Sequence, residues 1–310
     1  MKQRMKILVA YDGSEHADAA LHDLKRAGLG SDVEALVMTL ADVFVPPGID
    51  EDTLPVYMPE GVKRAHEQAR HKLAEAQGLA KRASEQLHSI FPDWIVSFEA
   101  EADSPAWALI RKADQWKPDL IVMGARGHSV FGGRLILGSI SQRVLYEAHC
   151  SVRIARSSNR RADQPVRIMI AVDNSPDSIA VVDQVCRRQW PKGTEAGLLA
   201  VVDTVMAIAS DSAEPSTVKW IEVAKEENWD QVREVFEPAA QKLRNAGLHA
   251  EVLISRGDPA DQILQEAHTW GAECIFVGAK GTRGIDRLLL GSVSSAVSAR
   301  AHCSVEVVRP

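Results

Sequence analysis

The sequence has little with which to crosslink itself or to hold a metal ion. Among its 310 residues are only four cysteines, and they form neither a C-x-x-C pair nor a spacing typical of zinc sites. This argues against a disulfide-stapled secreted domain and against a structural zinc site. We expect the protein to lie in a reducing compartment, with its cysteines as buried thiols: Cys150, Cys186, Cys274 and Cys303.

Long hydrophobic runs are also missing. The first apolar run, Ile7–Ala10, is too short for a signal-peptide core, and no stretch approaches the ~18 apolar residues that a membrane span needs. The formal net charge is −6 and the pI about 5.9, so no overall field draws the chain to nucleic acid or to an anionic membrane. We therefore expect a cytoplasmic protein that binds neither membrane nor nucleic acid.

Several catalytic and phosphate-binding motifs are absent as well. There is no G-x-x-x-x-G-K-[ST], and no G-x-G-x-x-G follows the first apolar run, which disfavours a P-loop NTPase and a dinucleotide-binding dehydrogenase. His66 and His71 stand one residue too far apart for a zinc-protease helix and would point about 140° apart. His149–Cys150 and His302–Cys303 lack a third, orienting group, so we interpret them as packing turns. With no acid/base pair visible, we expect no dedicated enzyme.

One local excess of positive charge lies near the middle of the chain, at Arg153, Arg156, Arg160, Arg161 and Arg167. We interpret it as part of a solvated linker rather than as a phosphate-binding patch. The stretch Arg156–Pro165 is polar, lacks apolar periodicity and ends at a proline, which is typical of an exposed linker. We predict a first domain over residues 1–157, a linker over 158–165 and a second domain over 166–310.

The two halves repeat the same segments in the same order. The aligned pairs are Met5–Ser14 with Val166–Ser175, Asp103–Ala106 with Gly257–Ala260, Asp119–Gly127 with Glu273–Gly281, Leu137–Ser139 with Leu290–Ser292, and Ala148–Val152 with Ala301–Val305. Chance does not produce five ordered matches, so the chain contains a duplicated domain.

Within each half, short apolar runs alternate with amphipathic stretches. The predicted strands are Ile7–Ala10, Glu34–Leu40, Ile95–Ala100, Leu120–Met123 and Val152–Ala155, then Ile168–Val172, Leu198–Val202, Ala250–Ile254, Cys274–Val277 and Val305–Val308. A long helix is predicted between the second and third strands of each half, because apolar residues recur there every three or four positions. These stripes are Val62, Ala65, Ala69, Leu73, Ala76, Ala80, Ala83, Leu87 and Ile90 in the first half, and Trp229, Val232, Phe236, Ala239, Leu243 and Ala246 in the second.

This alternation predicts an α/β fold with two tandem doubly wound domains. Each would be a five-stranded, mostly parallel sheet flanked by helices. In such a sheet the ligand crevice lies at the carboxyl ends of the strands. The residues that follow the strands are therefore the candidates for a binding site.

An aspartate turn follows the first strand of each half, Asp12-Gly13-Ser14 and Asp173-Asn174-Ser175. A carboxylate at this position could accept hydrogen bonds from a ribose or help to hold a cation. The aspartate could equally cap the following helix, and serine is also a good cap residue. The residues alone leave both interpretations open.

A glycine-rich stretch follows the fourth strand of each half, with Gly124, Gly127 and Gly138-Ser139 in the first and Gly278, Gly281 and Gly291-Ser292 in the second. Glycines let the backbone approach a phosphate closely. Each Gly-Ser pair opens a helix whose N-terminal amides and dipole favour an anion. A plain turn with a serine cap is the alternative, but its recurrence in both halves favours a phosphate-binding loop.

The combination of Asp-Gly-Ser, Gly-x2-Gly-x9-Gly-Ser and a short last strand resembles the universal stress proteins. The resemblance covers nearly the whole chain and implies a tandem member with an adenine-nucleotide alpha-hydrolase-like fold. It also implies a stress-response regulator that binds ATP with Mg²⁺ or Mn²⁺. The residues it carries over are Asp173, Val201, Gly278, Gly281, Gly291 and Ser292 in the second half, and Asp12, Leu40, Gly124, Gly127, Gly138 and Ser139 in the first. Lys280 lies in the second loop, where it could pair with phosphate or be a solvated cation.

Each half departs from the family pattern at one place. The first has ten residues instead of nine between Gly127 and Gly138, and the second has Asn174 where the first has Gly13. The spacing favours the second site.

The resemblance further implies that the domains pair through their last strands, Val152–Ala155 against Val305–Val308, and that two chains associate as a homodimer. An interaction module with an unknown protein partner and no nucleotide is the alternative, and a slow ATP hydrolase a less favoured one.

Overall fold

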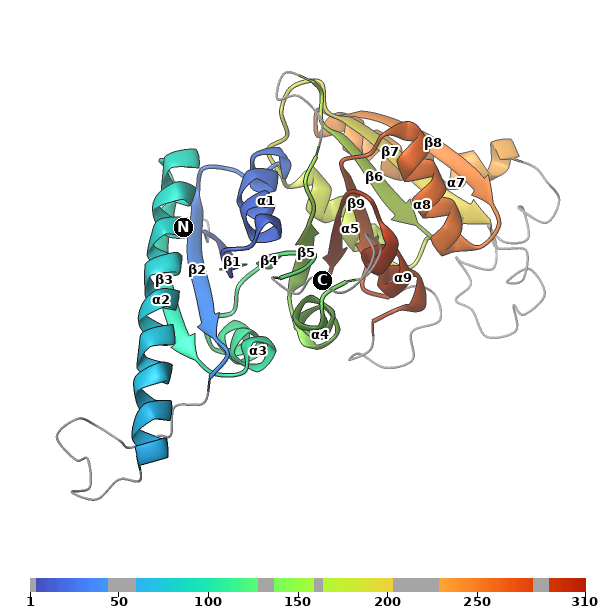
Figure 1. Cartoon of the computed structure of the whole chain (residues 1–310). Coiled ribbons are helices and arrows are strands. Elements are labelled where there is room, and N and C mark those ends of the chain that lie inside the picture. The colour runs from blue at the N-terminus through green and yellow to red at the C-terminus, as the bar shows by residue number, and fades with distance from the viewer. Residues whose placement is uncertain (1–3, 44–59, 128–136, 159–163, 203–228, 281–289) are drawn as a thin grey trace.

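The computed structural model describes residues 4–43, 60–127, 137–158, 164–202, 229–280 and 290–310 (Figure 1). Its first half contains β1 (Met5–Ala10), α1 (Glu15–Asp23), η1 (Leu24–Arg26), β2 (Val33–Ala41), α2 (Glu60–Ile90), β3 (Ile95–Ala102), α3 (Pro105–Trp116), β4 (Leu120–Gly124), α4 (Ser139–Glu147) and β5 (Ser151–Ala155). Its second half contains β6 (Arg167–Val172), α5 (Pro176–Cys186), β7 (Glu195–Val202), α7 (Trp229–Asn245), β8 (His249–Arg256), α8 (Pro259–Trp270), β9 (Cys274–Gly278), α9 (Ser292–Arg300) and β10 (Ser304–Val308). All ten predicted strands and both long helices are confirmed.

The strands form one ten-stranded sheet in the order β3-β2-β1-β4-β5-β10-β9-β6-β7-β8. Neighbouring strands within each half are parallel, as predicted for a doubly wound fold. Parallel strands need helical crossovers, which cover both faces and explain why β4 and β9 are apolar and buried along their whole length. The prediction of two tandem domains of this class is confirmed.

The two halves meet through β5 and β10, which pair antiparallel in the middle of the sheet. Val152 is opposite Val307 and Ile154 is opposite Val305, so the predicted pairing of the last strands within one chain is confirmed. A single hydrophobic cluster contains residues of both halves on one face of the sheet, among them Val152, Ile154, Ile275 and Val305. The junction is therefore part of the protein core.

The prediction for α2 was wrong at its beginning. The sequence pattern places Val62 and Ala65 on the core-facing side of the helix, but both are exposed in the structure. The helix has 31 residues and is therefore about 46 Å long, whereas β2 has nine residues and spans about 30 Å. The first turns of α2 thus extend past the sheet (Figure 1). In α7, the first predicted stripe residue, Trp229, is exposed, and the last, Ala246, lies just beyond the end of the helix and is also exposed.

The prediction for the basic residues was also wrong. Arg153 lies in β5 and is only 1% exposed, and Arg156 is half-buried against the second half. Arg167 lies in β6 and pairs with Glu195. Arg160 and Arg161 lie outside the described residues. The described arginines therefore belong to the sheet and the domain junction rather than to a solvated linker.

Candidate functional site

The aspartate turns end β1 and β6 in the same way. One carboxylate oxygen of Asp12 accepts a hydrogen bond from the Ser14 amide at 3.0 Å, and Asp173 does the same with the Ser175 amide at 3.1 Å. The serines cap the helices that follow. Ser14 Oγ accepts a hydrogen bond from the amide of Ala17 in α1, and Ser175 Oγ accepts one from the amide of Ser178 in α5. The aspartates therefore brace the turn, and the interpretation that they cap the helix was wrong.

The substitution of asparagine for glycine leaves this turn unchanged. Gly13 has φ of 78° and Asn174 has φ of 60°, so both adopt the left-handed conformation. Asparagine tolerates this region better than most residues with a side chain. The departure of the second half from the family pattern therefore does not alter the backbone.

The helices after the glycine loops begin without a side-chain cap. Gly138 is the N-cap of α4 and Gly291 the N-cap of α9, and neither position carries a side-chain hydrogen bond. Each glycine amide donates instead to the first loop residue after the strand, Ala125 at 2.9 Å and Ala279 at 2.8 Å. Ser139 and Ser292 follow as exposed first residues of their helices. The first amides of a helix have no partner within the helix, so these two ends can accept an anion.

The glycine loop of the first half packs directly on the aspartate turn. A Cβ atom at Gly127 would lie 2.6 Å from the second carboxylate oxygen of Asp12, and one at Gly124 would lie 2.7 Å from the backbone of His16. Only glycine allows these approaches. The structure thus brings together Asp12, Gly124, Gly127 and the Gly138-Ser139 helix start, as the sequence predicted.

The apolar residues of the predicted site lie at the neighbouring strand ends. Leu40 is near the carboxyl end of β2 and packs partly buried against the main hydrophobic cluster, which also contains Leu137 at the start of α4. Val201 occupies the equivalent place near the end of β7 and is 9% exposed. Both therefore lie at the carboxyl ends of the strands, at the same edge of the sheet as the aspartate turns.

The second half differs in its loop after β9. The amide of Lys280 donates to a carboxylate oxygen of Asp177 at 3.0 Å, and a Cβ atom at Gly278 would lie 3.0 Å from the Asp177 Cβ. Asp177 is in the first turn of α5, at the position that His16 occupies in α1. Sequence reasoning missed Asp177, although aligning the two halves would have shown the exchange of histidine for aspartate. Gly281 and both loop spacings lie outside the described residues.

The paired His-Cys dipeptides carry no sign of a nucleophile. Burial raises the pKa of Cys150 to about 11 and that of Cys303 to about 12, so both thiols stay protonated at neutral pH. His149 pairs with Asp114 at 2.9 Å rather than with its neighbouring cysteine. This agrees with a packing turn. Cys274 and Cys303 are buried as predicted, whereas Cys150 and Cys186 are partly exposed.

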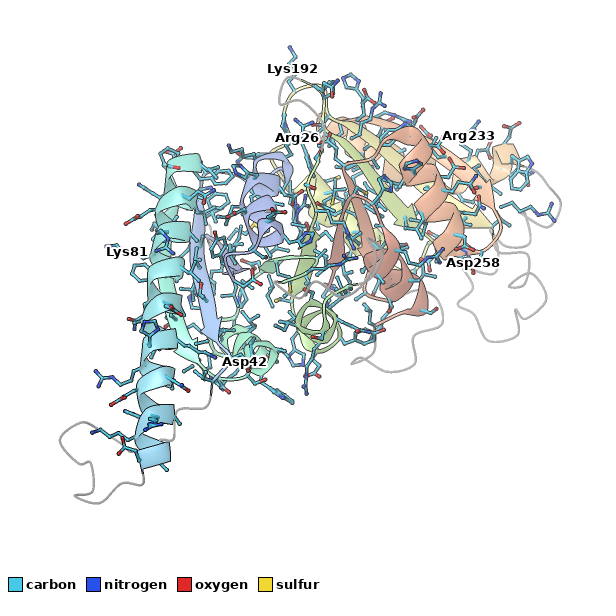
Figure 2. All side chains as sticks on the ribbon, in the orientation of Figure 1. Arg26, Asp42, Lys81, Lys192, Arg233 and Asp258 are labelled. Carbon is cyan, nitrogen blue, oxygen red and sulfur yellow. The ribbon has the colours of Figure 1, made fainter. Side chains whose placement is uncertain are left out.

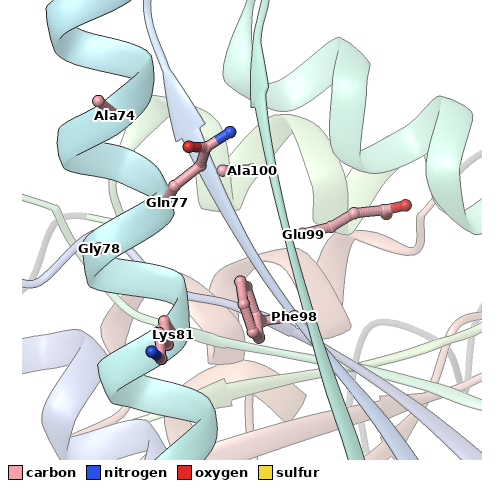
Figure 3. Close-up of a pocket in the computed structure, with 7 residues that line it drawn as sticks. All are labelled: Ala74, Gln77, Gly78, Lys81, Phe98, Glu99 and Ala100. Atoms are coloured by element: carbon pink, nitrogen blue, oxygen red, sulfur yellow. The ribbon is translucent and has the colours of Figure 1, made fainter.

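An open groove of about 570 Å³ lies elsewhere, between α2 and the edge strand β3. Figure 3 shows Phe98 of β3 pointing toward α2, where Gln77, Gly78 and Lys81 line the groove; Lys81 is also labelled in Figure 2. Phe98 is 44% exposed. None of the predicted site residues that the structure describes lines this groove.

Comparison with known proteins decides the family. The sequence profile of the Universal stress protein family matches the chain twice, over residues 3–156 and 166–309. The chain belongs to the universal stress protein family. It is a tandem member, and the recognition made from its motifs is confirmed.

Some relatives of this universal stress protein match it along nearly the whole of both chains. One from Mycolicibacterium smegmatis is 28% identical over 98% of this chain and 97% of its own length. One from Mycobacterium tuberculosis is 26% identical over 98% of this chain and 96% of its own length. The crystal structure of a universal stress protein from Archaeoglobus fulgidus shares the fold, with a TM-score of 0.64 at 19% identity over 98% of each chain.

The helices that the structure describes include none that is both long enough and apolar enough to cross a membrane.

Proposed function

We propose that this universal stress protein binds an adenine nucleotide, ATP with Mg²⁺ or Mn²⁺, and acts as a nucleotide-dependent regulator of a stress response rather than as a dedicated enzyme. The observation that carries the proposal is the uncapped start of α4 and α9 beside the aspartate turn. Helix amides without a partner, together with the helix dipole, favour a phosphate group. The arrangement occurs after the same strand in both halves.

Each predicted residue has a chemical part in this site. The carboxylates of Asp12 and Asp173 would accept hydrogen bonds from ribose hydroxyls. Leu40 and Val201 would offer apolar surface to the adenine ring. The glycine loops with Ser139 or Ser292 would donate hydrogen bonds to the phosphates.

The residues also fit a cation that comes with the nucleotide. Mg²⁺ is commonly held by one or two carboxylates together with substrate phosphates, and Asp12 or Asp173 would supply such a carboxylate. Within the described ranges, no group of three or more His, Cys, Asp or Glu side chains forms a separate metal site. We therefore expect the cation to bind with the phosphates rather than alone.

The two domains should differ in affinity. The Lys280 amide already donates to the Asp177 carboxylate, which places a negative charge beside the second loop. The first domain has His16, which carries no negative charge, at the equivalent position. We expect the first domain to hold the phosphates more tightly, in contrast to the preference drawn from loop spacing.

The first experiment is to purify the protein without added nucleotide, denature it, and identify and count the released nucleotides by chromatography. We expect ATP or ADP at one to two per chain, and binding of Mg-ATP by calorimetry after the nucleotide is removed. Asp12→Asn and Asp173→Asn are matched variants that keep the size of the side chain and remove its charge.

An empty protein that also gives no heat of binding with Mg-ATP would refute the proposal and leave an interaction module with a protein partner. ADP formation that depends on time and exceeds that of a variant altered at both helix starts, Gly138→Ala/Ser139→Ala and Gly291→Ala/Ser292→Ala, would instead indicate a slow ATP hydrolase.

A further inference from the structure

The residues that face each other at the centre of the domain junction have opposite charges. Arg153 is the third residue of β5, and Glu306 is the third residue of β10. Because the two strands pair antiparallel about an approximate two-fold axis, these equivalent positions are opposite each other in the register. The duplicated position therefore holds a cation in one domain and an anion in the other.

The two side chains belong to a buried row of alternating charges. Arg153 Nε donates to Asp23 Oδ2 at 2.5 Å, and Arg153 Nη1 donates to Glu306 Oε2 at 3.1 Å. The other carboxylate oxygen of Glu306 accepts from Arg188. Exposure along the row is 8% for Asp23, 1% for Arg153, 0% for Glu306 and 4% for Arg188. The row is neutral as a whole, with two members from each domain.

The charge on Arg153 depends on this row. Burial is the largest influence and lowers the pKa of its guanidinium, but the carboxylates of Asp23 and Glu306 outweigh it and hold the pKa well above its usual value. Arg153 is therefore a buried cation, and a buried cation is stable only beside an anion.

Two arginines beside this row, one from each domain, make equivalent contacts with the backbone of the other domain. Arg156 donates to the carbonyls of Cys303 and Ser298, and Arg309 donates to the carbonyls of Cys150 and Leu145. These backbone contacts do not distinguish one domain from the other. The central charges do distinguish them, and so does the hydrogen bond between Tyr146 and Ser295, because the second domain has Ala299 at the position equivalent to Tyr146.

We propose that the row Asp23–Arg153–Glu306–Arg188 makes this interface selective for unlike domains. A first domain pairs with a second domain through β5 and β10, and neither pairs with a copy of itself. Pairing of two first domains would bring two Arg153 side chains together, and pairing of two second domains would bring two Glu306 side chains together. Like charges in contact away from water are strongly unfavourable. Any association of two chains must therefore use another surface or exchange unlike domains.

Charge reversal in the full chain tests the proposal. Arg153→Glu and Glu306→Arg each create a like-charge pair at the centre, and each should lower the midpoint of thermal unfolding by on the order of 10 °C. The double variant R153E/E306R restores opposite charges and should recover at least half of that loss. Glu195→Arg is the control, because the Arg167–Glu195 pair lies within the second domain and is 34% and 32% exposed. Its reversal should shift the midpoint by only about 2 °C.

Mixing the two single variants tests selectivity between chains. A tagged Arg153→Glu chain should capture an untagged Glu306→Arg chain, because each acidic centre then meets a basic one, and neither variant should capture its own kind. Losses that simply add in the double variant would overturn the proposal. So would self-capture as efficient as capture of the opposite variant.

Discussion

Exchanging one residue between the two domains should exchange their affinities for phosphate. The perturbations are Asp177→His in α5 and the reciprocal His16→Asp in α1, which fill equivalent positions. Asp177→His removes the carboxylate that the Lys280 amide contacts, and His16→Asp introduces a carboxylate near the first loop, whose Gly124 lies against His16.

The size of the effect follows from the charge. A pair of unit charges about 4 Å apart interacts with ~4 kcal/mol at an effective dielectric of about 20. Asp177 is only partly buried, and salt screens exposed charges, so we expect about 1–2 kcal/mol to remain. This corresponds to a change of roughly 5- to 30-fold in the dissociation constant of one site.

The assay is calorimetric titration with Mg-ATP of nucleotide-free wild type, both single variants and the double exchange. The wild type should show one tighter and one weaker site. Asp177→His should strengthen the weaker site, and His16→Asp should weaken the tighter one. Adenosine, which lacks phosphate, serves as the control ligand, since its affinity should not change. Two equal sites that neither substitution alters would refute the reasoning, while leaving nucleotide binding itself intact.

Three further predictions concern glycine, histidine and cysteine. Gly124→Ala places a Cβ 2.7 Å from the His16 backbone and should lower the free energy of unfolding, measured with denaturant, by about 1–3 kcal/mol. Gly138→Ala is the control and should cost less, because the nearest atom to its Cβ would be 3.4 Å away. Equal costs for the two variants would contradict this packing argument. Burial, His268 and Arg156 lower the pKa of His302 in the folded state, so protonation favours unfolding and stability should fall as the pH drops below about 6.5 towards the lowered pKa. His302→Gln should flatten that fall in a pH series of thermal midpoints, whereas His149→Gln, which removes the partner of Asp114, should not. Cys274 and Cys303 are buried, and burial raises the pKa of both thiols, so both should resist alkylation in the native state. Rapid labelling of Cys303, located by mass spectrometry, would revive the idea of a reactive thiol.

Most of the fold was predictable because its signals are local. Each strand is a short apolar run, and each long helix shows a stripe at helical spacing, so type and position follow from neighbouring residues. The duplication added a second, independent copy of every motif. The aspartate turns and the glycine loops could be located in the same way, since Gly124 and Gly127 mark places where the backbone must approach another group closely.

The sequence by itself thus determined two domains of one kind, their strands and the place of the candidate site. Only the tertiary structure decided what the charged residues do. The local sequence predicts Arg153 in a solvated basic linker, whereas the pairing of β5 with β10 places it opposite Glu306 in the core. Asp177 and Lys280 are likewise far apart in the chain and in contact in the fold. The physical reason is that the energy of a charge depends on its burial and on its partner. Both are set by which elements pack together and in which direction, and no local pattern records that.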